Sequence, residues 1–117
     1  MDKSGDPIIE KTKELMELVR RSRPYQDYKS SLEAVRASGA LYDKLNLFRR
    51  RNIEADFIED PEERSKAIDM IYHEFEDVLI DPVSVRFLSC EQKVCRTLQK
   101  IYETIADSVD LDLSHFD

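Results

Sequence analysis

The residues able to hold a metal or act as catalysts are few in this sequence. Its imidazoles are His73 and His115, and its thiols are Cys90 and Cys95. A carboxylate-bridged di-iron bundle would need two Glu-x-x-His motifs, and the sequence has none. It also lacks a strand-turn-helix serine and a cysteine paired with a clearly positioned base. We therefore predict that the protein is not an enzyme and that His73 is an ordinary exposed residue of a helix.

The two cysteines are weak candidates for a metal site. Cys90 and Cys95 lie five positions apart, and this spacing separates them by about 140° around a helix. They are therefore poorly placed to clamp one metal together. We expect Cys95, beside an apolar stripe, to be a small buried hydrophobic residue. In the alternative, each cysteine donates one thiolate to a metal or cluster shared between subunits.

Charge and composition exclude several classes of function. A formal net charge of −7 repels polyanions and argues against extensive direct binding of nucleic acid. The two glycines, Gly5 and Gly39, are too few for a phosphate-binding or dinucleotide-binding loop. No window approaches ~18 consecutive apolar residues, and the polar start of the chain does not resemble a signal peptide. We therefore expect a cytoplasmic protein without membrane insertion.

The sequence predicts an all-α fold of about five helices in a single domain over 1–117. Asp-Pro pairs at residues 6–7, 60–61 and 81–82 indicate helix starts, because Asp can cap free amides and Pro in the first position loses no hydrogen bond. The weak break at Ser38-Gly39 leaves open whether one or two helices follow residue 24. The expected elements are an N-terminal helix over 6–22, one or two helices over 24–58, a helix over 61–80, a long C-terminal helix over 82–109, and a frayed tail over 110–117.

Apolar periodicity predicts the inward face of each helix. The first helix should use Ile8, Ile9, Leu15, Met16 and Val19. The helix from Pro24 should use Tyr25, Tyr28, Leu32 and Val35. The helix after Gly39 should use Leu41, Leu45, Phe48, Asn52 and Ala55. The helix after Pro61 should use Ile68, Ile71, Tyr72, Phe75, Val78 and Leu79.

The last helix carries a heptad-like seam. Apolar positions alternate spacings of four and three, as in a coiled coil; the seam comprises Phe87, Glu91, Val94, Leu98, Ile101, Ile105 and Ser108, and Leu88, Cys95, Tyr102 and Val109 widen it. A helix over 82–109 would be about 42 Å long, whereas a compact domain of this size is about 35 Å across. We expect it to extend beyond its domain and to be covered by another copy. The predicted architecture is an oligomeric bundle, a dimer or a tetramer, of long antiparallel helices with coiled-coil-like packing.

The predicted partner or oligomer interface consists of most of this seam together with Phe48 on an earlier helix. Within the seam, Glu91 stands out because an unpaired carboxylate is costly to bury. We expect it to pair with a Lys or Arg of a neighbouring helix and to set the register; in the alternative it recognises a partner. The interface residues are Phe87, Glu91, Val94, Leu98, Ile101, Ile105 and Phe48.

A run of three cations, Arg49, Arg50 and Arg51, follows Phe48. Such a run is typical of a solvated helix face. The alternative is a docking patch for an acidic protein surface or for RNA.

Two stretches of the chain resemble the YlbF/YmcA family of small helical bacterial regulators. In the first, Tyr25-Gln26-Asp27-Tyr28-Lys29 leads to Phe48-Arg49. In the second, Pro82-Val83 is followed by Phe87-Leu88 and then by Glu91, Val94, Leu98, Ile101 and Ile105. The resemblance rests on their order and spacing over residues 25–112.

The resemblance implies a cytosolic, non-enzymatic protein of Gram-positive-type bacteria that forms homo-oligomers or hetero-oligomers with sibling proteins. It further implies a complex that adjusts ribonuclease Y during messenger RNA maturation and supports competence, sporulation and biofilm formation. Complexes of this family can carry iron–sulfur clusters held by cysteines, some of them in a C-terminal tail. The last residues here contain no cysteine, so we expect no cofactor.

Two other functions stay open at the level of sequence. One is an RNA-binding accessory protein that uses Arg49, Arg50, Arg51 and nearby tyrosines. The other is a redox sensor that uses Cys90 and Cys95 to hold an iron–sulfur cluster or a metal.

Overall fold

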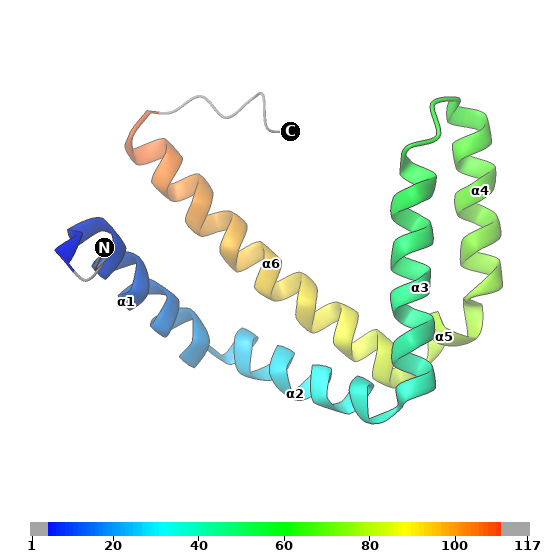
Figure 1. The fold of residues 1–117 in the computed structure, drawn as a ribbon, viewed down its shortest axis with the longest axis horizontal. Coiled ribbons are helices and arrows are strands. Elements are labelled where there is room, and N and C mark those ends of the chain that lie inside the picture. Colours follow the sequence, from blue (N-terminus) through cyan, green and yellow to red (C-terminus); the bar gives the residue numbers. More distant parts are fainter. Residues whose placement is uncertain (1–4, 111–117) are drawn as a thin grey trace. The chain divides into compact units, whose positions relative to one another are not determined.

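The computed structural model describes residues 5–110, and every regular element in that range is helical (Figure 1). This confirms the predicted all-α fold for the described part of the chain. The predicted tail from residue 111 onward and His115 lie outside the described residues. In chain order the helices are α1 (Pro7–Arg21), α2 (Arg23–Ala37), α3 (Gly39–Asp56), α4 (Pro61–Glu74), α5 (Glu76–Ile80) and α6 (Pro82–Ser108).

The three Asp-Pro pairs begin helices as predicted. The Ile8 amide donates to Asp6 Oδ1 at 3.0 Å at the start of α1. The Glu63 amide donates to Asp60 Oδ2 at 3.3 Å at the start of α4. At the start of α6 the Val83 amide donates to Asp81 Oδ1 at 2.9 Å. Each aspartate thus satisfies an amide that has no partner within its own helix.

One helix boundary settles an alternative that the sequence left open, and another differs from the expected one. Ser38, with φ −100° and ψ 77°, separates α2 from α3, so the segment over 24–58 forms two helices. The segment over 61–80, expected as one helix, is broken at Phe75, where φ is −103° and ψ is 19°. The apolar period of three and four residues continues across Phe75, so the sequence pattern does not mark this break. The described residues therefore contain six helices and not five.

The chain divides into two compact units, a division that the sequence does not indicate. The first combines the N-terminal residues through Tyr28 with the residues from Cys90 onward, and the second is residues 29–89. The helices α2 and α6 each contribute residues to both units.

The second unit has a packed core. Its helices α3 and α4 form a hairpin followed by α5 (Figure 1). The Phe48 ring meets Tyr72 edge-on at a centroid distance of 5.3 Å and Phe75 at 5.7 Å, within the range that aromatic pairs prefer. The inward faces predicted for α3 and α4 supply most of this core, whose buried apolar residues are Val35, Leu45, Phe48, Ala55, Ile71, Phe75, Val78 and Phe87.

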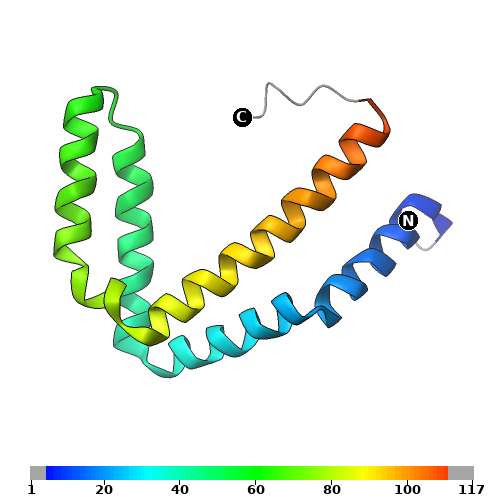
Figure 2. The same ribbon diagram turned by 180° about the vertical axis from the view of Figure 1, so that it is seen from behind.

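The first unit is much less well covered. Within it, α1 and the C-terminal half of α6 run alongside each other in opposite directions (Figures 1 and 2). Among its described residues only Cys90 and Ala106 are buried, and α1 contains no buried residue. An amphipathic helix of a globular protein normally buries its apolar stripe. The apolar faces of this unit are therefore only partly covered.

Candidate partner-binding surface

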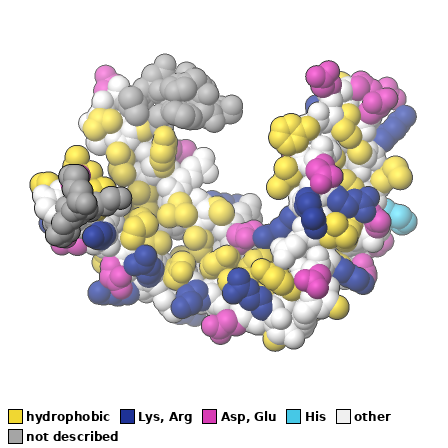
Figure 3. Space-filling view, in the orientation of Figure 1, with side chains coloured by type: hydrophobic (Ala, Val, Ile, Leu, Met, Phe, Trp, Pro, Cys, Tyr) yellow, Lys and Arg dark blue, Asp and Glu magenta, His cyan; other side chains and the backbone are white. Residues whose placement is uncertain are grey.

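The C-terminal half of α6 presents an apolar face to solvent. Its exposed members follow one another at spacings of three and four residues, which places them on one side of the helix. The exposed fraction is 43% for Leu98, 54% for Tyr102 and 55% for Ile105. Figure 3 shows hydrophobic side chains gathered along this part of α6. We call this face the outer stripe; it consists of Cys95, Leu98, Tyr102, Ile105 and Val109.

The outer stripe is not the ordinary solvent face of α6. Successive residues are 100° apart on a helix, so the residues on the side of α6 opposite the outer stripe can be identified from their positions in the sequence. That side is mostly charged, with the exposed Thr104 as a neutral member; its charged residues are Lys93, Arg96, Lys100, Glu103 and Asp107. A helix with one charged face normally buries the apolar one, so the outer stripe has the pattern of a contact surface.

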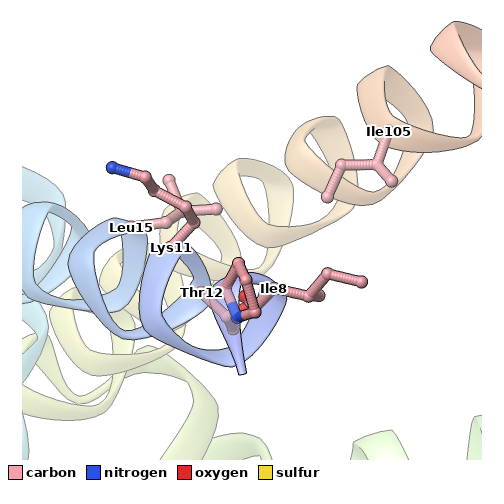
Figure 4. Close-up of a pocket in the computed structure, with 6 residues that line it drawn as sticks. Ile8, Lys11, Thr12, Leu15 and Ile105 are labelled. Carbon is pink, nitrogen blue, oxygen red and sulfur yellow. The ribbon is translucent and has the colours of Figure 1, made fainter. Parts of the chain in front are cut away.

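A groove of about 450 Å³ lies between the start of α1 and the end of α6 (Figure 4). Ile8 and Ile105 extend from their helices into the space between them. Ile8 is 75% exposed although it belongs to the face predicted to point inward. The groove thus extends the apolar surface of the outer stripe onto α1; its lining residues are Pro7, Ile8, Lys11, Thr12, Leu15 and Ile105.

The structure divides the predicted seam of α6 into two groups. Glu91, Val94 and Ile101 are half-buried, whereas Leu98 and Ile105 are exposed. The half-buried group is partly covered by its own chain, and the exposed group joins the outer stripe. The pairing of Glu91 with a cation of a neighbouring helix stays a prediction.

Phe48 and Phe87 require a correction, because both were assigned to the interface. Their exposed fractions are 6% and 2%, and both belong to the core of the second unit. Their side chains are covered by their own chain and so present no surface to a partner in this structure. The seam spacing continues from the second unit into the first, which is why it could not separate core residues from surface residues.

The three successive arginines do not form one continuous patch. The Arg49 guanidinium lies 5.0 Å from the Phe87 ring centroid, and that of Arg51 lies 5.5 Å from the Phe75 ring centroid. Arg51 also forms an ion pair with Glu74. Arg50 is exposed. Two of the arginines thus cover core rings through cation–π contacts, and the docking role of the run stays a prediction.

This arrangement predicts different effects of two otherwise matched substitutions. Arg51→Gln should lower the free energy of unfolding by about 1 kcal/mol, because the cation–π contact and the ion pair are lost. Arg50→Gln removes the same charge and should change it by less than about 0.5 kcal/mol. Urea titration followed by circular dichroism measures both. Equal effects would contradict a structural role for Arg51.

A further arginine contact stabilises the junction between α2 and α3. The Arg36 guanidinium lies 5.7 Å from the Tyr42 ring centroid. Hydrogen bonding by Arg36, and then by Asn46, lowers the pKa of Tyr42 below its ordinary value, because both contacts favour the phenolate. The contact bridges the break at Ser38 within the second unit.

Cys95 is not buried within its own chain, so its expected burial would require a partner. Cys95 is exposed in the outer stripe, whereas Cys90 is buried. Periodicity identified an apolar half of α6 but not which part of that half turns inward. Within residues 5–110 no three His, Cys, Asp or Glu residues come together as metal ligands. One thiol is buried and the other lies on the surface, and the expected absence of a cofactor stays a prediction.

One exposed apolar pair was missed by the sequence reasoning. Ile53 and Phe57 lie on α3 and at its C-terminal end, with exposed fractions of 59% and 80%. Both fall outside the predicted inward face of Leu45, Phe48 and Ala55. Their position off that face is the sequence signal that could have identified them as exposed.

None of the helices between residues 5 and 110 combines the length and apolarity needed to cross a bilayer. A protein-family model described as control of competence regulator ComK, YlbF/YmcA, matches residues 8–110. The match includes most of α1, which precedes the stretch on which the resemblance was based. No curated protein and no solved structure matches the chain.

Proposed function

Because the chain belongs to the YlbF/YmcA family, described as controlling the competence regulator ComK, we propose that it is a non-enzymatic regulatory protein that acts by binding other proteins. The family supports the regulatory role. The binding mode is inferred from the surfaces of the first unit.

The observation that carries this proposal is the uncovered apolar surface of α1 and α6. In the first unit, the described part of α1 buries no residue, and four large members of the outer stripe are exposed. Burying one such side chain contributes roughly 1.5–3 kcal/mol. Several buried together can exceed the cost of association, which is on the order of 4–15 kcal/mol.

The occupant of this surface is a second copy of the chain or a sibling of the same family. A heptad-spaced stripe is complementary to another stripe of the same kind, since knobs of one helix fill holes of the other. If the outer stripe occupies the a and d positions of a coiled coil, the flanking e and g positions carry no charge. Charged residues there would favour a parallel or an antiparallel pairing of the helices. The e and g residues are Val94, Gln99, Ile101, Ala106 and Ser108. Either a dimer or a tetramer would cover the stripe.

At the cellular level, we propose that the assembled protein modulates ribonuclease Y in the cytosol. In this proposal it affects messenger RNA maturation and, through it, competence, sporulation and biofilm formation. The support is family membership together with a chain whose surfaces suit protein contacts.

Affinity purification from native cells tests this function. The tagged chain should recover sibling proteins of the family and ribonuclease Y, and the recovery should fall when Leu98 is replaced by Glu. The Gln92→Glu chain, changed at an exposed position outside the outer stripe, is the matched control. Recovery of neither siblings nor ribonuclease components by the unmodified chain would overturn the assignment.

A further inference from the structure

The tip of the α3–α4 hairpin, in the second unit, presents an apolar pair that the outer stripe does not include. Ile53 and Phe57 are four residues apart and so lie on the same side of the end of α3. They are 59% and 80% exposed. We call these two residues the tip patch. A single exposed apolar side chain is common on protein surfaces, whereas two adjacent large ones at a hairpin end form a small contact surface.

Local hydrogen bonds hold the tip in a defined conformation. The Phe57 amide donates to the Glu54 carbonyl at 3.2 Å, and the Ile58 amide donates to the Ala55 carbonyl at 3.1 Å. Half-buried Arg64 reaches back from α4, and its Nη1 donates to the Ile58 carbonyl at 3.1 Å. Phe57 is therefore presented on an ordered turn, so a partner would order little additional chain on binding.

Most charged residues near the tip patch in the sequence are acidic, while the exposed Arg50 lies three residues before Ile53 and Arg64 bonds to the Ile58 carbonyl. Residues 53–63 contain six acidic side chains and no Lys or Arg, and all six are exposed. This short segment accounts for almost all of the net charge of −7. Figure 3 shows Asp and Glu side chains gathered at the end of the hairpin. We call this group the acidic rim; it consists of Glu54, Asp56, Glu59, Asp60, Glu62 and Glu63.

We propose that the tip patch and the acidic rim together bind a basic amphipathic helix of a partner protein. The apolar pair requires an apolar face on the ligand, and the surrounding negative charge requires Lys or Arg beside that face. Nucleic acids and anionic membranes carry the wrong charge for this surface. The tip belongs to the second unit and the outer stripe to the first, so the tip's occupant need not be the partner that covers α6.

A labelled synthetic peptide tests the proposal with the full chain. The probe is a helix of about five turns with Leu on one face and Lys on the other, and its binding is followed by fluorescence anisotropy. A peptide of the same pattern with Glu in place of Lys is the ligand control. We expect the Lys peptide to bind and salt to weaken its binding, because the rim charges are exposed.

Matched variants locate the binding site. The triple variant Glu54→Gln, Asp56→Asn, Glu59→Gln should weaken binding of the Lys peptide about tenfold. The variant Phe57→Ala should weaken it by a similar factor, about tenfold. The control triple removes the same number of charges from exposed positions elsewhere in the second unit and should weaken binding less than about twofold; it consists of Glu33→Gln, Asp43→Asn and Asp69→Asn.

Several results would overturn the proposal. These are failure of the Lys peptide to bind, equally tight binding of the Glu peptide, an equal loss in the tip and control triples, or unchanged binding by Phe57→Ala. Light scattering on the tip variants separates this inference from the proposed function. Their mass should equal that of the unmodified chain, and a changed mass would instead assign the tip to the oligomer interface.

Discussion

Leu98→Glu is expected to abolish the proposed self-association and leave monomers. Leu98 lies within the outer stripe and is 43% exposed in the single chain, so a substantial part of its side chain is open to a partner. In the assembly the substitution would replace a buried leucine, worth roughly 1.5–3 kcal/mol, with a carboxylate that has no designed partner. Together these losses should weaken self-association at least about 100-fold.

Light scattering across a concentration series measures this effect. The Gln92→Glu chain introduces the same charge at an exposed position outside the outer stripe and should assemble like the unmodified chain. Alkylation supplies an independent readout, because Cys95 belongs to the stripe and Cys90 is already buried. Assembly should protect Cys95 in the unmodified chain and not in Leu98→Glu. An unmodified chain that stays monomeric, with Cys95 reactive at every concentration, would contradict self-association.

Local signals in the sequence were sufficient to place most helix starts. Asp6, Asp60 and Asp81 each cap a helix, because an aspartate followed by proline satisfies a free amide wherever the tertiary structure puts it. The long last helix was also predictable, since its end at Ser108 is one residue from the expected boundary. These features depend on contacts within a few residues of one another.

Features set by tertiary packing were not predictable. The stripe of α6 is apolar over nearly half its circumference, so periodicity alone could not decide that Cys90 turns inward and Cys95 outward. The break at Phe75 likewise leaves the apolar period unchanged. The arginine run gave no sign that Arg49 and Arg51 lie over core rings. Both arginines meet rings that are more than twenty residues away in the sequence, which a local pattern cannot indicate.

The same distinction between local and tertiary signals applies to the surface on which the proposed function rests. Sequence spacing predicted that α6 would be a contact helix, but it assigned Phe48 and Phe87 to the interface when both are core residues of the second unit. The outer stripe is recognised only when exposure is added to spacing. A seam residue can therefore be a folding residue or a binding residue, and substitution at the two kinds should affect different measurements.

Phe48→Ala is expected to destabilise the second unit by about 3–5 kcal/mol, the range for truncating a buried phenylalanine. Phe48 is 6% exposed and makes edge contacts with Tyr72 and Phe75, so its truncation removes these contacts and leaves a cavity in the core. For a unit of this size, 1 kcal/mol shifts Tm by about 4–8 °C. Thermal unfolding followed by circular dichroism should thus show a decrease of more than about 10 °C.

The matched control is Phe57→Ala, which removes the same side chain from the same helical hairpin at a position that is 80% exposed. Its free energy of unfolding should change by less than about 0.5 kcal/mol, because few contacts of the folded chain are lost. The two phenylalanines differ chiefly in burial, so the comparison separates a residue that maintains the fold from one available to a partner. A large loss of stability in Phe57→Ala would show that Phe57 maintains the fold and is not free to bind a partner. A small loss in Phe48→Ala would contradict the assignment of Phe48 to the core of the second unit.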